Sequence, residues 1–307
     1  MPGEGPLLEV ELAVDYPTKP GALRNVRFSL QSGERMGLVG ESGSGKSTIA
    51  LALLGLLRWK GGRATGRVLF AGNDLFTAGE KQLQHVRGRK IGLVLQSPTA
   101  SLNPALRIGT QLGEAWRAHS TSSKPTLDRA VHTALARVGL PDGEEFQRRY
   151  PSQISVGQAQ RVLIAMAVMH SPQLLIADEP TSALDAVTQL EILDMLMTLN
   201  RELGMALLYI SHDLQSVASL CTRMAILERG TIVEQGRTES VLRSPRHPYA
   251  QQLVSCAPWL QWWLKESAST GRSTPPLSRV HEAAAQVPSA HGQPAWSLKS
   301  PHQQPMG

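Results

Sequence analysis

Residues 40–47 have the types and spacing needed to bind phosphate groups. Their sequence, Gly-Glu-Ser-Gly-Ser-Gly-Lys-Ser, fits the pattern G-x-x-x-x-G-K-[ST]. A short apolar strand is predicted before it at 36–39, and an apolar, helix-compatible run follows at 48–57. In such a turn successive backbone N–H groups point inward, and the dipole of the following helix adds positive potential. We therefore predict a nucleoside triphosphate site formed by Gly40, Glu41, Ser42, Gly43, Ser44, Gly45, Lys46, Ser47 and Thr48.

Two side chains of this segment supply chemistry that the backbone cannot. The Lys46 ammonium can reach the β- and γ-phosphates, and the Ser47 hydroxyl can help to hold Mg²⁺, a hard cation that prefers oxygen ligands. The alternative is a flexible loop of glycine and serine. The strand and the helix predicted around the segment argue against that alternative.

Two adjacent carboxylates follow a second apolar strand. Residues 174–177 are all apolar and run into Asp178 and Glu179. A buried parallel strand presents such acids at its carboxyl end, where ligands bind in open α/β sheets. Asp178 is therefore expected near Mg²⁺, and Glu179 is placed to polarise a water for in-line attack on the γ-phosphate.

Three further residues have two interpretations each. Gln96, after an apolar strand at 91–95, is either a plain strand-end amide or a ligand of Mg²⁺ and the attacking water. His212, at the tip of a strand, is either a core histidine or a hydrogen-bond donor to charge developing on the γ-phosphate. Tyr16 is either an ordinary strand-end aromatic or a platform for adenine stacking. The residues alone leave all three pairs open.

A second glycine-containing turn stands at a helix N-terminus. Its sequence, Ile-Ser-Val-Gly-Gln at 154–158, precedes an apolar helix, so it is another predicted anion site. One chain would then carry two phosphate-binding elements for one nucleotide. A head-to-tail dimer explains this economically, because the second turn of one subunit would close the ATP site of the other.

Composition limits the class of protein. The chain has 307 residues and a formal net charge of +6, with basic and acidic residues interleaved. This favours a solvated surface of mixed charge over a basic face for nucleic acid. The only cysteines, Cys221 and Cys256, are far apart, which argues against a thiolate metal site and for a reducing cytoplasm. The start of the chain does not resemble a signal peptide, and the apolar runs at 49–57 and 162–169 fall short of the ~20 residues of a membrane helix.

The remaining pattern predicts how the chain is organised. Alternating segments at 7–14 and 26–30 read as strands, mostly helical sequence runs from 108 to 149, and residues 224–233 read as a hairpin. Residues 267–307 are predicted to be disordered. The aromatic segment 259–264 could cap the core, dock on a partner or sit at a membrane interface.

Taken together and in order, these motifs resemble the ATP-binding subunit of an ABC transporter. The resemblance rests on the phosphate loop, Gln96, the turn at 154–158, the strand ending in Glu179, the segment Ser-Ala-Leu-Asp at 182–185, and His212, and it covers residues 7–253. It implies an α/β fold, a P-loop ABC-type nucleotide-binding domain with a RecA-like, mostly parallel core, an antiparallel β subdomain and a helical insertion at about 97–170. That domain would span 1–257, and 258–307 would be a largely disordered C-terminal extension.

The same resemblance implies roles for individual residues and names ATP and Mg²⁺ as the ligands. Glu179 would be the catalytic carboxylate, acting with Lys46, Gln96 and His212. The residues expected to contact the partner's nucleotide are Ser155, Gly157 and Gln158. Asp185 would couple the two sites, and Tyr16 would be the adenine platform. The metal ligands would be Ser47, Gln96 and Asp178.

Two longer segments resemble the importers of dipeptides, oligopeptides and nickel. They are Leu-Gln-Ser-Pro-Thr-Ala-Ser-Leu-Asn-Pro at 95–104 and Ser-Pro-Arg-His-Pro-Tyr at 244–249. In that family the region after the glutamine lines the groove that takes a helix of the permease. The partners implied are two transmembrane permease subunits, a second and paralogous ABC ATPase and, indirectly, an extracytoplasmic solute-binding protein, with no nucleic acid. The location implied is peripheral, at the cytoplasmic face of the cell membrane.

Other functions fit the sequence less well. A soluble ABC ATPase that acts on nucleic acid or ribosomes usually has two cassettes in one chain or a long coiled-coil insertion. This chain has one cassette and no long heptad run. A P-loop kinase or GTPase would have no use for the second turn or for His212.

The chain departs from the family pattern in two places. Val156 stands where the family usually has glycine, and its Cβ is expected to perturb close approach to the γ-phosphate. Some family members also carry a C-terminal cysteine cluster for iron–sulfur. Only Cys256 lies in that region, so we predict no cluster.

Overall fold

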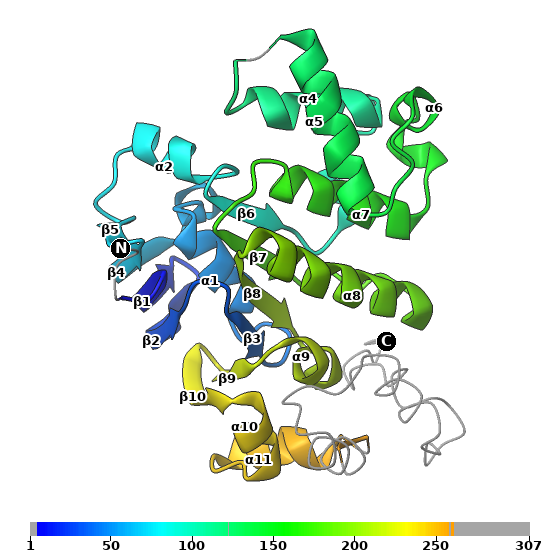
Figure 1. The fold of residues 1–307 in the computed structure, drawn as a ribbon. Coiled ribbons are helices and arrows are strands. Elements are labelled where there is room, and N and C mark those ends of the chain that lie inside the picture. Colours follow the sequence, from blue (N-terminus) through cyan, green and yellow to red (C-terminus); the bar gives the residue numbers. More distant parts are fainter. Residues whose placement is uncertain (1–4, 122, 258, 261–307) are drawn as a thin grey trace, which may run out of the picture.

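A computed structural model describes residues 5–121, 123–257, 259 and 260. Figure 1 shows two β-sheets, with a group of helices standing above the larger sheet. The predicted disordered segment 267–307, and most of 258–307, lie outside the described residues.

An antiparallel sheet of four strands has the order β2-β1-β4-β5. The bounds are Leu8–Tyr16 for β1, Lys19–Leu30 for β2, Arg63–Phe70 for β4 and Asn73–Asp74 for β5. Buried and exposed side chains alternate along most of β1, as a half-buried strand requires, which confirms the strand predicted at 7–14. Val10 pairs with Phe28 on one neighbour and Val68 on the other, so apolar residues share one face.

The larger sheet has six strands in the order β10-β9-β3-β8-β7-β6, and all neighbouring pairs except β10–β9 are parallel. The bounds are Arg35–Val39 for β3, Ile91–Val94 for β6, Leu174–Asp178 for β7, Ala206–Ser211 for β8, Arg223–Glu228 for β9 and Thr231–Arg237 for β10. Every residue of β7 and β8 is buried, because helices cover both faces. The predicted hairpin is β9–β10.

Two hydrophobic clusters lie on opposite faces of this sheet. Along β7 and β8 the apolar side chains alternate between them: Leu175 and Leu207 belong to one cluster, and Leu174 and Leu208 to the other. The first cluster also includes Trp259 and Leu260. For these two residues of the aromatic segment, packing on the chain's own core is confirmed, and 261–264 lie outside the described residues.

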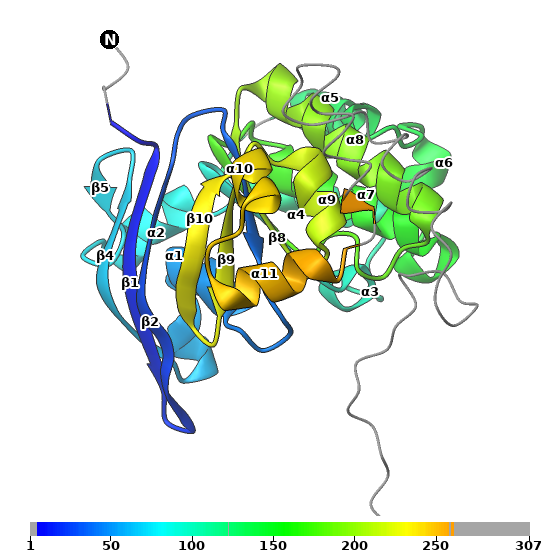
Figure 2. The ribbon, with the colours of Figure 1, turned by 90° about the horizontal axis from the view of Figure 1, so that it is seen from below.

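Helices connect and cover the strands. The first follows the phosphate-binding loop but ends earlier than the predicted run at 48–57, because Gly55 adopts a positive φ of 63° that a helix cannot continue through. The bounds are Lys46–Leu53 for α1, Leu57–Lys60 for the short 3-10 helix η1, Glu80–Val86 for α2, Ala186–Leu203 for α8, Leu214–Leu220 for α9, Thr238–Arg243 for α10 and Pro248–Ser255 for α11. In Figure 2 α11 lies beside β10, away from the antiparallel sheet.

The helical group lies between β6 and β7 in the chain. Its elements are Pro98–Ser101 for α3, Ile108–Arg117 for α4, Lys124–Arg137 for α5, Glu144–Gln147 for α6, Pro151–Gln153 for the 3-10 helix η2 and Val156–Val168 for α7. Leu112, Leu135 and Val162, from three of these helices, are fully buried in the first cluster. No helix in the described ranges is long and apolar enough to cross a membrane.

The strand that leads into the phosphate-binding loop is packed tightly by α9. A Cβ added to Gly37 in β3 would overlap the Cγ1 of Val217, which is fully buried in α9. Glycine therefore allows α9 to approach the strand closely, and the loop that follows β3 depends on this packing.

We expect Gly37→Ala to lower the free energy of unfolding by ~1–3 kcal/mol, the usual range for an overpacked core. Adding Val217→Ala should recover part of the loss, because it removes the overlapping methyl groups. Denaturant unfolding of the full chain measures both effects, with Gly5→Ala as the control, since its Cβ would meet nothing within 4 Å. Equal stability of Gly37→Ala and wild type would contradict this account.

Candidate functional site

The loop between β3 and α1 forms a compact anion cradle. Gly43 and Gly45 have positive φ angles of 79° and 110°, and a Cβ on Gly40 would overlap the carbonyl oxygen of Leu227. These three positions therefore require glycine, for conformation or for space. The Lys46 ammonium is 4% exposed and donates to the carbonyl oxygens of Gly40 at 2.8 Å and Glu41 at 2.9 Å. Burial is the main cause that lowers the Lys46 pKa, and neighbouring carboxylates oppose it.

The cradle is held by elements distant in the sequence. The backbone N–H of Gly230, in the β9–β10 turn, donates to the Ser44 carbonyl oxygen at 2.9 Å. The backbone N–H of Glu41 donates to the Tyr249 hydroxyl at 3.2 Å. Tyr249 lies on α11, so the C-terminal helix contacts the loop directly. The pattern of segment 244–249 does not predict this role for Tyr249, because only the fold brings Tyr249 to residue 41.

Local hydrogen bonds fix the start of α11. The Glu234 carboxylate on β10 accepts from the backbone N–H groups of Arg246 and His247, each at 2.9 Å to Oε2. His247 caps the helix by accepting from the Tyr249 N–H at 3.3 Å, and Pro248 occupies the first helical position, where its missing N–H costs nothing. This arrangement explains the spacing of the segment and orients the Tyr249 side chain toward the cradle.

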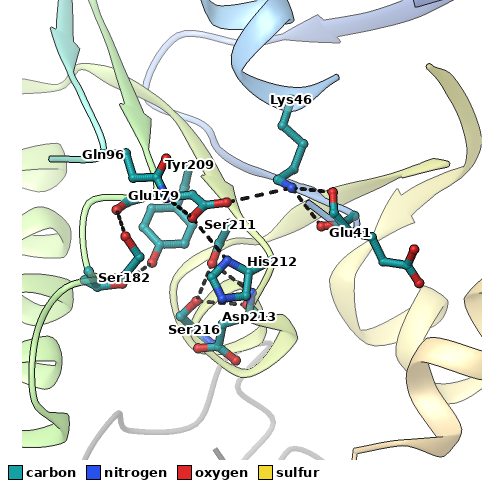
Figure 3. Close-up of polar contacts among 12 residues, drawn as sticks. Glu41, Lys46, Gln96, Glu179, Ser182, Tyr209, Ser211, His212, Asp213 and Ser216 are labelled. Atoms are coloured by element: carbon teal, nitrogen blue, oxygen red, sulfur yellow. Dashed lines mark hydrogen bonds and ion pairs between the residues drawn. The ribbon is translucent and has the colours of Figure 1, made fainter. Parts of the chain in front are cut away.

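The Glu179 carboxylate is the centre of the polar contacts at the sheet edge (Figure 3). Gln96 Nε2 donates to its Oε2 at 2.8 Å, and His212 Nδ1 lies 3.2 Å from the same oxygen. Lys46 Nζ lies 3.8 Å from Oε1. These predicted residues therefore meet around one carboxylate whose side chain is 12% exposed.

Glu179 has an uncommon backbone conformation. Its φ of 48° lies in the left-handed region, which costs a non-glycine residue ~1–2 kcal/mol. The Glu179 N–H donates to the Ile210 carbonyl at 2.8 Å, and the Ser182 hydroxyl donates to the Glu179 carbonyl at 3.1 Å. The surrounding structure thus holds the strained residue and turns its side chain toward Lys46 and His212.

The carboxylate and the imidazole stabilise each other's charged forms. The hydrogen bond to Glu179 is the main cause that raises the pKa of His212 above its ordinary value of 6.5. The same contact is the main cause that lowers the pKa of Glu179 below 4.5, against the effect of burial. Glu179 is therefore ionised at neutral pH, as a group that orients and polarises a water must be.

A buried network of hydroxyl groups lies next to the Glu179–His212 pair. The Tyr209 hydroxyl lies 3.1 Å from Thr181 Oγ1 and also hydrogen-bonds to Ser216, and burial raises the Tyr209 pKa. Asp213 caps α9 and accepts from Gln189 Nε2 at 3.2 Å. The network ties the turn after Glu179 to the turn that carries His212. The motifs in the sequence do not predict this network, although a tyrosine inside an otherwise apolar strand is a signal of a buried polar contact.

The residues predicted to hold Mg²⁺ lie beside the cradle. Asp178 is 4% exposed, and its Oδ1 has no hydrogen-bond partner in the described chain. Burial is the main cause that raises its pKa, and a hydrogen bond from Ser47 opposes this. Ser44 Oγ is likewise buried and has no hydrogen-bond partner among the residues that the structure describes. Orphaned oxygens at a phosphate cradle fit a hard divalent cation held partly by phosphate oxygens.

The second predicted anion turn forms a separate cluster. Ser155 caps α7: its Oγ accepts from the Gln158 N–H at 3.1 Å, and Gln158 Oε1 accepts from the Ser155 N–H at 3.1 Å. Gly157 packs against Thr188, whose Cγ2 would be 2.7 Å from an added Cβ. Asp185 caps α8 and accepts from the Thr188 hydroxyl at 2.7 Å. Within the described ranges none of the hydrogen bonds of Ser155, Gln158 and Asp185 reaches the phosphate cradle.

Tyr16 and Val156 are the remaining residues that the sequence singled out. Tyr16 ends β1 and packs on Gly62, where an added Cβ would lie 2.7 Å from the ring. Val156 is 41% exposed at the start of α7, and Val187 is 67% exposed on α8.

Comparison with known proteins identifies the family. The family model described as "ABC transporter" matches residues 23–182. The oligopeptide transport ATP-binding protein OppD of Bacillus subtilis (strain 168) is 40% identical over 88% of this chain and 77% of its own length. The probable D,D-dipeptide transport ATP-binding protein DdpD of Escherichia coli (strain K12) is 40% identical over 82% of this chain and 79% of its own length.

A solved structure agrees with this similarity. The dimeric, post-hydrolysis state of the ATP-binding cassette MJ0796, bound to ADP and Pi, superposes with a TM-score of 0.66 at 27% identity, over 75% of this chain and 98% of that one. The parallel core, the cradle and the acidic strand end described above are the features expected of such a cassette. The chain therefore belongs to the ABC transporter family, as an ATP-binding and ATP-hydrolysing cassette.

Proposed function

We propose that this chain powers an importer that takes up oligopeptides, dipeptides or a related small solute such as nickel through a partner permease. ATP hydrolysis by this chain is supported by one observation: Lys46, Gln96 and His212 all contact the Glu179 carboxylate. The solute class is supported by the printed functions of the two relatives. The rival, a soluble ATPase acting on nucleic acid or ribosomes, finds no support among these relatives.

We assign a part of the hydrolysis to each of these residues. Glu179, ionised and fixed by its backbone, polarises the water whose oxygen attacks the γ-phosphorus while the bond to the β-phosphate oxygen breaks. Lys46 neutralises charge on the phosphates, and His212 donates to the charge that develops. Gln96 orients the Glu179 carboxylate and contributes to the metal site with Ser47 and Asp178. Mg²⁺ held there would neutralise the β- and γ-phosphate oxygens.

The separate Ser155 cluster supports a head-to-tail dimer. Ser155, Gly157 and Gln158 would close the nucleotide of a second ABC ATPase, and Asp185 would couple the two sites. The exposed side chains of Val156 and Val187 would be covered in that dimer. Val156 adds a branched side chain at the Ser155 turn, so a paralogous partner with its own signature turn suits this chain better than an identical copy.

The surface after Gln96 is the proposed contact with the permease. Leu95 follows β6 and is 42% exposed, and the short helix α3 comes next. Two transmembrane permease subunits would dock here, which would hold the chain at the cytoplasmic face of the membrane as a peripheral subunit. An extracytoplasmic solute-binding protein would act through the permeases, and no nucleic acid is involved. Tyr16 is the proposed platform for adenine.

Glu179→Gln should retain ATP binding but lower the turnover rate on the order of a thousandfold, which is ~4 kcal/mol in the barrier. Glutamine keeps the shape but removes the charge that polarises water. ATPase assays measure turnover, and size-exclusion chromatography with ATP should detect a trapped dimer.

Lys46→Ala is the matched comparison for that variant. It should abolish productive ATP binding, so equilibrium binding of a fluorescent ATP analogue separates the two substitutions. Equal turnover of Glu179→Gln and wild type would remove Glu179 from the catalytic role.

The transport assignment is tested by affinity purification of the tagged chain from its native membranes in mild detergent. Two polytopic permeases and a second ABC ATPase should copurify, and an untagged preparation is the control. Ribosomal proteins or nucleic acid without any membrane partner would contradict the importer and favour the soluble rival.

A further inference from the structure

A hollow of about 390 Å³ lies apart from the ATP site, between α2 and the end of α4. It shares no residue with the phosphate cradle or with the Ser155 cluster. In the described residues its lining is dominated by basic and polar side chains and contains no aspartate or glutamate: Lys81, Gln84, His85, Arg89, Arg117, Ala118, His119, Ser120 and Thr121.

Among the described residues, the permanent cations that line this hollow form no ion pair, and no acid lies in the lining beside them. Elsewhere on the described chain, arginines such as Arg87 and Arg148 form ion pairs with glutamates, whereas no carboxylate lies within 4.0 Å of Lys81, Arg89 or Arg117 in the described residues. Instead Arg89 Nη1 lies 3.5 Å from His85 Nε2. This contact places two basic groups side by side.

The wall of the hollow is packed, which holds these groups in place. The His119 ring meets His170 edge-on at 5.3 Å, and His170 stacks on Trp116 at 4.7 Å with an interplanar angle of 10°. His170 Nε2 lies 3.3 Å from the Ala115 carbonyl oxygen. On the other side Gly88 has a φ of 74°, and a Cβ there would lie 2.9 Å from His119 Nε2. The turn after α2 and the end of α4 are therefore fitted to each other around His119.

The pKa of His119 is lowered partly by the positive charges around it. Burial is the main cause that lowers its pKa, followed by repulsion from His170 at the end of α7 and from Arg89 and His85 on the α2 side. Lys81 and Arg117 line the same hollow, whose described lining contains no acid. A multivalent anion would relieve this repulsion and favour proton uptake by His119.

We propose that the hollow between α2 and α4 is a binding site for a phosphate group, carried either by an anionic lipid headgroup or by a soluble phosphate compound. Two guanidinium groups and an ammonium match the charge of a phosphate better than that of a single carboxylate, and arginine forks suit phosphate geometry. The amide and hydroxyl groups of Gln84, Ser120 and Thr121 supply further hydrogen bonds at the rim.

Histidine NMR of the full-length protein tests the site directly. The His119 resonance, assigned with His119→Gln, should shift saturably on addition of pyrophosphate, and the His119 pKa should rise. Acetate at the same ionic strength should not produce this shift. Because the measured signal comes from His119 itself, pyrophosphate that binds at the distant phosphate cradle does not contribute to it.

Arg117→Gln and Arg89→Gln should weaken this response at least about tenfold, the effect of one lost charge-assisted hydrogen bond. Arg129→Gln, an exposed arginine on α5 outside the hollow, is the matched control and should respond like wild type. No response of His119, an equal response to acetate, or an unchanged response in both Arg117→Gln and Arg89→Gln would overturn the proposal.

Sedimentation with vesicles then separates the two sources of phosphate. Binding to vesicles of phosphatidylcholine with phosphatidylglycerol, lost in Arg117→Gln but kept in Arg129→Gln, would identify a lipid headgroup. A His119 response to pyrophosphate without vesicle binding would identify a soluble phosphate compound.

Discussion

The contact between the Glu179 carboxylate and His212 is the interaction on which the rest of the site depends. It joins the ends of two neighbouring parallel strands, and Gln96 and Lys46 approach the same carboxylate from a third strand end and from the phosphate cradle. The left-handed backbone at Glu179 is what directs the side chain there, and a hydrogen bond to Ile210 holds it. Strain in the backbone and charge in the side chain are thus combined at one residue, as is common where a structure must hold a reactive group.

The contact between Glu179 and His212 stabilises the folded protein over a limited range of pH. Glu179 has a lowered pKa, so its contribution to stability is present above 4.5 and is lost as pH falls through its folded value. His212 has a raised pKa, so its contribution is complete below 6.5 and is lost as pH rises through its folded value. The paired charges are therefore fully favourable between these two limits. His212 is 57% exposed, and solvent screening keeps the contribution of the pair to stability modest.

Much of this site could be predicted from the sequence because its parts are local. The phosphate cradle, the apolar strand ending in Asp178 and Glu179, and the Ser155 helix cap each depend on a few adjacent residues with strong conformational preferences. The contacts that could not be predicted join residues far apart. The Tyr249 hydroxyl reaches Glu41 across 208 positions, and Tyr209 meets Thr181 across 28. The early end of α1 was missed because the apolar pattern outweighed a single glycine, Gly55.

The most direct test of the account is an NMR titration of His212 in the nucleotide-free, full-length protein, in wild type and in Glu179→Gln. The resonance is assigned with His212→Gln, and the other histidines serve as an internal reference. The structure predicts that the wild-type pKa lies above 6.5 and that it falls in Glu179→Gln, because the main cause of the shift is removed. Identical titration curves in the two proteins would show that the carboxylate and the imidazole do not interact, and the proposed catalytic centre would lose its basis.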